Sequence, residues 1–250
     1  MNEVGIHVGF RIIKYYFWQQ FFFKYQVNKA KQERSYQYLT NSLKEYDWKT
    51  PLMGDQSLSK CTFTIFDLET TGFFPEIGDE IISIGAVKFR NGKVQPQETF
   101  YQVINPLQRV SQDTKRFTGL NRRDFLRGVP FPIGLEKFLA FSRGTILVAH
   151  PASFDINFIQ ARSRKWGLPS FEPAFLDSFA LAKALYQNNK CYLDDLIKRF
   201  GIENRKRHHA LNDAMMTAEI FELLLSESKK YECTTLNLLQ DFIEEKTSSS

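Results

Sequence analysis

The sequence has few cysteines, and they are not placed to pair or to bind a metal together. Cys61, Cys191 and Cys233 lie far apart among 250 residues without a CxxC pair. This spacing argues against a disulfide scaffold and against a zinc ribbon. No run of 18 apolar residues occurs, so we expect no transmembrane helix. The N-terminal residues have neither the apolar core nor the small-residue cleavage site of a secretory signal. These absences favour the reduced cytoplasm.

The composition is typical of a folded chain with a mild excess of positive charge. Apolar residues make up 43% of the sequence, enough to bury a core rather than leave the chain disordered. Lysine and arginine number 33 against 28 aspartate and glutamate residues, a net charge of +5. A mildly basic body suits a polyanionic partner, but a charge of this size does not by itself indicate one.

Three regions follow from the pattern along the chain: residues 1–58, 59–228 and 229–250. The first is densely aromatic over residues 12–25 and then polar and helix-prone as far as Trp48. We expect a helical extension that packs on the main domain or on a partner; an amphipathic segment on a membrane surface is the alternative. Turn-forming residues mark the boundary to the second region. They are Pro51, Gly54, Asp55 and Ser57. The last region is predicted to be a helix or a tail.

The second region predicts an α/β domain with a mixed sheet. Asn91-Gly92 between two β-rich runs is a strong hairpin signal, so at least two strands are antiparallel. The predicted strands are Thr62–Leu68, Glu80–Arg90, Val94–Ile104, Thr145–Ala149 and Phe175–Asp177. The predicted helices are Ser111–Thr118, Pro132–Phe141, Ser153–Trp166, Ser178–Tyr186, Leu193–Phe200 and His209–Ser228.

Four carboxylates stand at positions from which they could converge. Asp67 and Glu69 are two residues apart, so the pleat of a strand places both on one face, at the strand's carboxyl end. Asp155 lies in the first turn of a predicted helix, and Asp213 interrupts an apolar run in the last helix. Each also has an ordinary explanation. A strand end can be solvated, a helix N-terminus favours acidic groups, and Asp213 could face water.

Three segments carry a resemblance to a known family. Phe66–Gly72, with the sequence FDLETTG, resembles the first motif of the DEDD exonuclease superfamily. His150–Asp155 resembles the second motif, and His208–Ala214 the third. Together they are similar to the histidine-containing subgroup that includes the proofreading epsilon subunit of bacterial replicative polymerases. The resemblance covers about residues 60–228 and implies a ribonuclease H-like mixed sheet with helices packed on both faces.

The resemblance also implies a catalytic centre. Asp67, Glu69, Asp155 and Asp213 would hold two metal ions, and the histidine of the third motif would take a proton from the attacking water. Two divalent cations can stabilise both the attacking and the leaving oxygen of a phosphodiester, and hard oxygen ligands suit Mg²⁺ or Mn²⁺. The spacing of five residues to Asp213 selects His208 as the general base. His209 is then interpreted as a surface residue at a helix start.

Substrate contacts are implied by the same motifs. The backbone of Thr70, Thr71 and Gly72 would approach the 3′-terminal nucleotide, and His150 would shape the site. Phe73 and Phe74 follow directly; they could stack on a base, although core packing is an equal alternative for one of them. Two basic clusters could track phosphates, or could simply be solvated. They are Lys115, Arg116, Arg122, Arg123 and Arg127, and Arg205, Lys206 and Arg207.

The predicted function is a metal-dependent 3′→5′ exonuclease that releases nucleoside monophosphates from single-stranded or frayed DNA ends, in proofreading or repair. A DNA polymerase is a candidate partner. A 3′ exoribonuclease is the first alternative, because no reader of the 2′-hydroxyl can be identified in the sequence. A non-catalytic scaffold that binds nucleic acid or a polymerase is the second. The complete set of carboxylates and the third-motif histidine argue against this last alternative.

Overall fold

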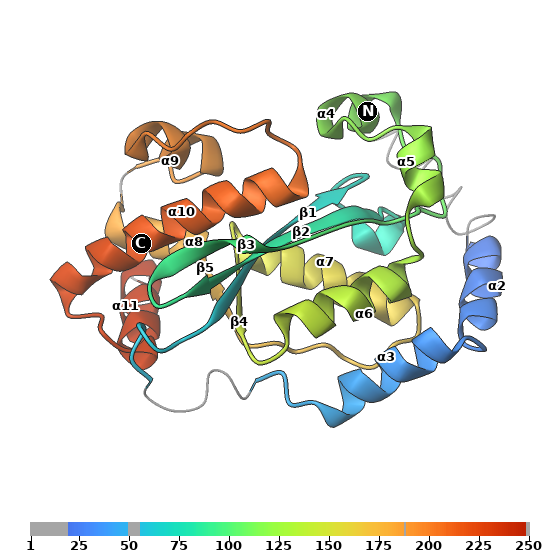
Figure 1. Cartoon of the computed structure of the whole chain (residues 1–250), viewed down its shortest axis with the longest axis horizontal. Coiled ribbons are helices and arrows are strands. Elements are labelled where there is room, and N and C mark those ends of the chain that lie inside the picture. Colours follow the sequence, from blue (N-terminus) through green and yellow to red (C-terminus); the bar gives the residue numbers. More distant parts are fainter. Residues whose placement is uncertain (1–19, 50–55, 188, 249–250) are drawn as a thin grey trace.

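The computed structural model describes residues 20–49, 56–187 and 189–248 (Figure 1). The aromatic residues 12–19 and most of the predicted linker, residues 51–55, lie outside this part of the chain. The described residues form one mixed sheet with helices on both sides, which confirms the predicted α/β class (Figure 1).

The sheet has five strands in the order β3-β2-β1-β4-β5. β2 is antiparallel to both β1 and β3, whereas β4 is parallel to both β1 and β5. The hairpin between β2 and β3 turns at Asn91 and Gly92, which both have positive φ angles, as its sequence predicts. The bounds are Phe63–Thr70 for β1, Ile81–Arg90 for β2, Lys93–Val103 for β3, Ile146–Ala149 for β4 and Phe175–Asp177 for β5.

One face of the sheet is covered mainly by α10 (Ala210–Ser228), a long helix that lies across β1 and β2. Phe221 of α10 packs edge-on against Phe63 and Phe89, with ring centroids 5.3 and 5.5 Å away. Three further helices extend this layer: α8 (Ser178–Leu185), α9 (Leu193–Phe200) and α11 (Leu236–Ser248). Of the helix and the tail expected after residue 228, the described residues form the helix: α11 buries Leu236, Leu239 and Phe242 in the core.

The opposite face is covered by α6 (Phe131–Ser142) and α7 (Ala152–Lys165), as the predicted bounds anticipated. Phe66 on β1 packs against Phe138 of α6, with ring centroids 5.2 Å apart. Since Phe66 and Asp67 are neighbours on one strand, burying Phe66 under α6 turns Asp67 toward the α10 side.

The N-terminal helices, α2 (Gln20–Ala30) and α3 (Arg34–Glu45), pack on this second face. Leu39, Leu43 and Trp48 are buried in the same core as α6 and α7. The backbone joins as well, because Ala174 N–H donates to the Trp48 carbonyl at 2.7 Å. The described part of the extension therefore packs on the main domain, which was the first of the two expectations. None of the described helices is long and apolar enough to cross a membrane.

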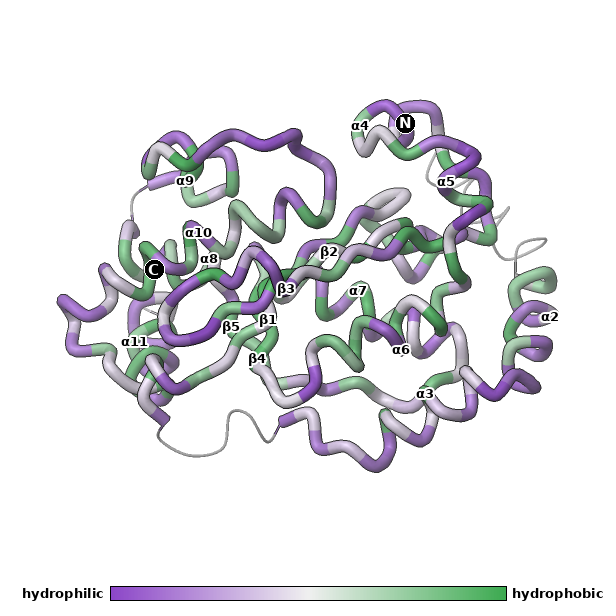
Figure 2. The backbone as a smooth tube through the Cα atoms, in the orientation of Figure 1, coloured by the Kyte–Doolittle hydropathy of each residue, from purple (hydrophilic) through white to green (hydrophobic). Residues whose placement is uncertain are grey.

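Two short helices, α4 (Gln112–Thr118) and α5 (Arg122–Arg127), close the end of the sheet next to the start of α10 (Figure 1). The sequence predicted the first and missed the second, whose six residues are too few to show helical periodicity. A small apolar cluster of Ile82, Val110, Leu120 and Phe125 holds the pair to the sheet. Figure 2 shows that the segment joining α9 to α10 is largely hydrophilic.

Gly85 lets α10 lie directly on the sheet. It stands opposite Asp67 in the β1–β2 register, and a Cβ atom there would overlap the backbone of Ala210 and Leu211. The absence of a side chain at this position therefore brings the first turn of α10, with Asp213, close to the carboxylates of β1.

Candidate active site

The four predicted carboxylates meet at the carboxyl end of β1. Asp67 and Glu69 leave the strand on its α10 side, opposite Gly85 and Ser83. Asp155 enters from the first turn of α7 and Asp213 from the first turn of α10, and both are buried, with 5% and 3% of their surface exposed. Three elements that are distant in sequence thus deliver four acidic groups to one place.

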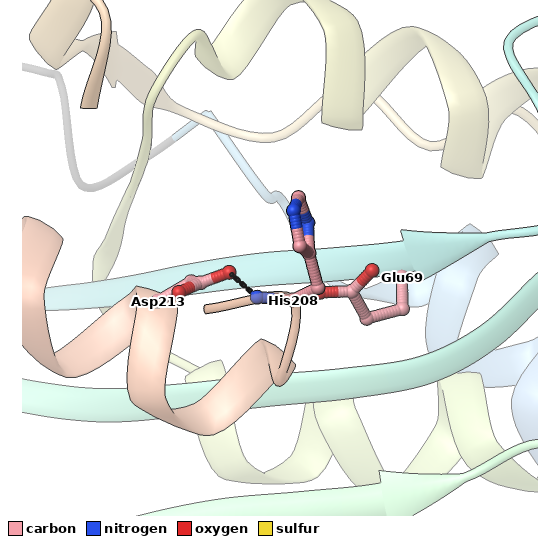
Figure 3. Close-up of side chains that lie close together, drawn as sticks. All are labelled: Glu69, His208 and Asp213. Carbon is pink, nitrogen blue, oxygen red and sulfur yellow. Dashed lines mark hydrogen bonds between the residues drawn. The ribbon is translucent and has the colours of Figure 1, made fainter. Parts of the chain in front are cut away.

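Glu69, His208 and Asp213 form the tightest part of this site (Figure 3). Each offers one potential metal-ligand atom, and these atoms lie within 4.8 Å of one another. This donor set, together with Asp67 and Asp155, consists of carboxylate oxygens and one imidazole. Such a set fits a hard divalent cation and resembles no thiolate zinc site.

The electrostatics show how unfavourable the carboxylate cluster is without a cation. Burial, followed by repulsion from Asp155, Glu69 and Asp213, raises the pKa of Asp67 well above its usual range. Burial and the charge of Asp213 raise the pKa of Glu69 to about 8. Burial also raises the pKa values of Asp155 and Asp213. Mutual repulsion of this kind is expected where ions normally separate the charges.

Arg207 supplies a positive charge that sequence reasoning did not place here. Its Nη1 lies 2.6 Å from Asp213 Oδ1, and its Nε donates to Asp194 Oδ1 at 2.7 Å. Its charge lowers the pKa values of Asp67, Glu69 and Asp213 against the effect of burial. The sequence presented Arg207 only as one of three adjacent basic residues. Its partner Asp194 is on α9, and no local pattern connects the two.

His208 and His209 occupy different environments. The His208 backbone is left-handed, with φ of 60°, and its N–H donates to Asp213 Oδ2 at 2.9 Å (Figure 3). Its side chain is exposed beside Glu69. His209 is half-buried and stacks on Tyr101, with ring centroids 4.5 Å apart. His209 is the N-cap residue of α10, which agrees with its interpretation as a helix start, but Tyr101 of β3 covers one face of its ring.

The segment after β1 is held in shape by its own hydrogen bonds. Thr71 N–H donates to the Glu80 carbonyl at 2.9 Å, and Glu80 N–H donates to Thr71 Oγ1 at 2.9 Å. Thr70 Oγ1 donates to the Gly72 carbonyl at 2.7 Å. A Cβ atom on Gly72 would overlap the Asp79 carboxylate, so this glycine has an internal steric reason that the sequence did not reveal.

Phe73 and Phe74 project from this segment into solvent, with 74% and 54% of their surface exposed. The core-packing alternative is therefore wrong for both. Phe73 keeps one edge against Phe154 of α7, with ring centroids 6.2 Å apart. Both rings thus offer free faces close to the carboxylates of β1.

A buried ion pair stabilises the segment after β1 through Glu80, which hydrogen-bonds to Thr71. Arg162 Nη2 donates to Glu80 Oε2 at 3.1 Å, and both side chains are almost fully buried. Glu80 also accepts the backbone N–H groups of Leu107 and Gln108, at 3.1 and 2.9 Å. Sequence reasoning missed this pair, since 82 residues separate its members.

His150 is bound on both ring nitrogens by the protein itself. Its Nε2 donates to the Cys191 carbonyl at 2.7 Å, and its Nδ1 lies 2.9 Å from Ser178 Oγ. Burial lowers its pKa, which favours the neutral ring. The ring therefore ties the segment before α7 to α8 and to the start of the 191–193 segment.

The comparisons with known sequences agree with this site. Residues 64–221 match the model of an exonuclease family, RNase_T. The chain is 40% identical over 166 residues to a PolC-type DNA polymerase III of Caldanaerobacter subterraneus, covering 66% of this chain and 12% of that protein. It is 33% identical over 186 residues to a DNA polymerase III subunit epsilon-like protein of Rhodobacter capsulatus, covering 73% and 26%. The chain thus spans about an eighth of the length of its PolC-type relative.

Solved structures show the same fold. The nuclease domain of 3′hExo, a DEDDh family member bound to rAMP, has a TM-score of 0.62 at 20% identity, over 69% of this chain and 95% of that one. Exonuclease X in complex with 5′ overhanging duplex DNA has a TM-score of 0.55 at 20% identity, over 71% and 99%. The predicted ribonuclease H-like architecture is therefore confirmed.

Proposed function

Since the chain belongs to the exonuclease family, we propose that it hydrolyses DNA from the 3′ end and releases nucleoside monophosphates. The observation that carries this proposal is the convergence of four carboxylates from β1, α7 and α10 beside the exposed His208. DNA is favoured as substrate because PolC-type relatives at 32–40% identity are DNA polymerases.

Asp67, Glu69, Asp155 and Asp213 would hold two divalent ions, Mg²⁺ or Mn²⁺. When bound, such ions neutralise the charge that develops on the attacking and leaving oxygens of a phosphodiester. The fit rests on this chain's own electrostatics. The raised pKa values of all four carboxylates mark a cluster that lacks sufficient positive charge, even with Arg207 in place.

His208 is proposed to accept the proton of the attacking water. An imidazole is suited to this role because it exchanges protons near neutral pH. Asp213 fixes the His208 backbone through its N–H, while the exposed ring remains open to a water molecule and can return the proton to solvent. We assign the role to His208 rather than His209, because the His209 ring stacks on Tyr101 whereas the His208 ring is exposed beside Glu69.

The segment after β1 is proposed to receive the 3′-terminal nucleotide. The backbone of Thr70, Thr71 and Gly72 is already held by internal hydrogen bonds, so it presents a fixed surface. Phe73 can stack on the terminal base, a contact worth about 1–3 kcal/mol that tolerates any sequence. His150 is proposed to shape this site through the contacts of both its nitrogens.

The wider context is also a proposal. Residues 59–228 carry the whole proposed site, and the described parts of the two flanking regions, 20–49 and 229–248, pack on it. The PolC-type relatives suggest proofreading or repair beside a DNA polymerase, which would be a separate partner or a further part of a longer chain. The three cysteines are buried free thiols, which suits a reducing compartment.

The proposal is tested with matched DNA and RNA oligonucleotides labelled at the 5′ end, in Mg²⁺ or Mn²⁺, with Asp155→Asn as the inactive control. A ladder that shortens from the 3′ end of DNA supports it. Preferential degradation of RNA would replace it with the exoribonuclease alternative. Binding of either oligonucleotide without cleavage, equal in wild type and Asp155→Asn, would favour the non-catalytic scaffold.

A further inference from the structure

The structure distinguishes between the two basic clusters that the sequence left open. In the cluster before His208, Arg205 Nη2 lies 2.6 Å from Glu219 Oε1, and Arg207 contacts both Asp194 and Asp213. The charges of these two arginines are therefore already used inside the protein. Of this cluster, Lys206 alone is left without a carboxylate among the described residues.

The other cluster includes cations that have no carboxylate partner among the described residues. A groove of about 340 Å³ lies beside α4 and α5, and we call it the α4–α5 groove. Arg109, Lys115 and Arg122 line it, together with Phe125 and Leu126. Within the described part of the chain, no carboxylate lies within 4.0 Å of any of the three cations.

The acidic residues of α4 and α5 themselves are engaged elsewhere. Asp113 pairs with Arg116 at 3.0 Å, outside the groove. Asp124 accepts the Asn121 N–H at 2.8 Å as part of the capping box that starts α5. Three cations that line one hollow without a carboxylate form a local site of positive charge, and phosphate is an anion that Arg binds with two parallel hydrogen bonds.

Helix α4 has side chains at both the groove and the candidate active site: Lys115 lines the groove, and Phe117 lies beside His208. Phe117, two residues after Lys115 on α4, has its ring centroid 5.8 Å from that of His208 and is 55% exposed. Gly119, directly after α4, lies against the end of Lys206. One short helix therefore connects the proposed general base to the groove, and it offers an exposed aromatic face on the way.

We propose that the α4–α5 groove binds backbone phosphates of the single strand upstream of the nucleotide that is being removed. The inference rests on the proposed function. A strand whose 3′ end lies at Asp67 and His208 would pass Phe117, where a base can stack, and place successive phosphates against Lys115, Arg122 and Arg109. The groove would then increase the affinity for long single strands but not for oligonucleotides too short to reach it.

The test compares two double variants that remove equal charge from neighbouring positions. Lys115→Ala/Arg122→Ala removes groove cations, whereas Arg123→Ala/Arg127→Ala removes two exposed arginines of α5 that do not line the groove. Binding of a fluorescent 15-nucleotide oligothymidylate is measured by anisotropy in EDTA over a series of KCl concentrations. Each single-strand phosphate contact contributes about 0.7 to the slope of log K against log salt, so the groove variant should lose about 1.4.

The groove variant should bind the 15-mer at least tenfold more weakly in about 0.1 M KCl, and Arg109→Ala should lower the slope by about 0.7. The ratio of kcat/KM for the 15-mer to that for a trimer should also fall at least tenfold. An unchanged slope, or an equal loss in the control variant, would overturn the proposal and leave the exonuclease activity standing. A wild type that binds through the groove but never cleaves would overturn the proposed function instead.

Discussion

Arg207 Nη1 lies 2.6 Å from Asp213 Oδ1, so an arginine charge contacts one of the four carboxylates directly. Asp213 uses its second oxygen for the His208 N–H, at 2.9 Å. The carboxylate is thereby fixed on both oxygens, between the proposed general base and a permanent cation. Asp194 holds that cation from α9, which makes the geometry of the site depend on three separate segments.

Replacing Arg207 should expose how much the cluster depends on its charge. Arg207→Ala leaves the buried Asp213 without its partner, and we expect a loss of about 2 kcal/mol in the free energy of unfolding without metal. Added Mn²⁺ should then raise the Tm more than in wild type, because the ion replaces a missing charge. Thermal unfolding with EDTA and with Mn²⁺ measures both effects. Asp194→Asn, which keeps the Arg207–Asp213 pair, is the control, and an equal Mn²⁺ gain in all three proteins would contradict the role.

Removing one carboxylate should relieve repulsion in the metal-free protein. Asp155→Asn is expected to leave the free energy of unfolding unchanged or higher in EDTA, while hydrolysis is abolished. Wild type should gain Tm on addition of Mn²⁺, because a ligand that binds the folded state alone stabilises it by mass action, and the variant should gain less. A wild type whose Tm ignores Mn²⁺ would argue against a metal site here.

The pKa of Glu69, raised to about 8 chiefly by burial, predicts a pH dependence of stability. Unfolded glutamate loses its proton near pH 4.5, whereas the folded protein keeps it until about pH 8. The folded state therefore binds more protons in this interval, and the free energy of unfolding should fall as pH rises through it. Urea denaturation in EDTA between pH 4.5 and 8.5 measures the fall. Glu69→Gln should reduce the fall without abolishing it, because Asp67, Asp155 and Asp213 also have raised pKa values. A variant curve as steep as that of wild type would contradict the assignment.

The two histidines should separate cleanly in kinetics. His208→Asn removes the proposed base but retains a residue that tolerates the left-handed backbone, so we expect kcat to fall about 10²-fold or more with little change in KM. His209→Asn, which only loses the stack on Tyr101, should cost less than about tenfold. Steady-state rates on a labelled oligonucleotide decide the matter. If the two variants exchange effects, the assigned register to Asp213 is off by one residue.

Truncation tests the domain boundary. A chain that starts at Ser57 loses Leu39, Leu43 and Trp48, each buried against α6, α7 or the 168–174 segment, and each worth about 1.5–3 kcal/mol of burial. We therefore expect a markedly lower Tm, or insolubility, although every motif residue remains. Soluble expression and thermal unfolding of the truncated chain provide the measurement. An unchanged Tm would show that residues 1–56 are dispensable for the fold.

The parts that could be predicted from sequence are those with local signals. The Asn91-Gly92 turn, the alternation around Asp67 and Glu69, and the spacing from His208 to Asp213 each follow from neighbours within a few residues. The pairing of Arg207 with Asp194 could not be predicted, because it depends on how α9 meets the start of α10.

The N-terminal region shows the same limit from another side. Its helical character was evident, but the burial of Leu39 and Trp48 depends on the apolar side chains of α6, α7 and the 168–171 segment, which form the same core. Lys88 is a further case: it lies buried in β2 with its Nζ donating to Thr64 Oγ1 at 3.0 Å. The sequence does not show whether a lysine in a strand will be buried, because this depends on whether a neighbouring strand offers it a hydroxyl acceptor.

Because of the contact at Gly85, main-chain atoms rather than side-chain rotamers set the distance between the sheet and α10 at the site. The sheet carries Asp67 and Glu69, the helix carries Asp213, and the two bodies touch through main-chain atoms at Gly85, Ala210 and Leu211. Any side chain at position 85 would overlap this backbone and would therefore push α10 away from the sheet. Every motif residue would then still be present, yet the carboxylates of β1 and α10 would be too far apart to hold the proposed ions. The single methyl group of Gly85→Ala would thus be enough to inactivate the proposed site without changing any motif residue.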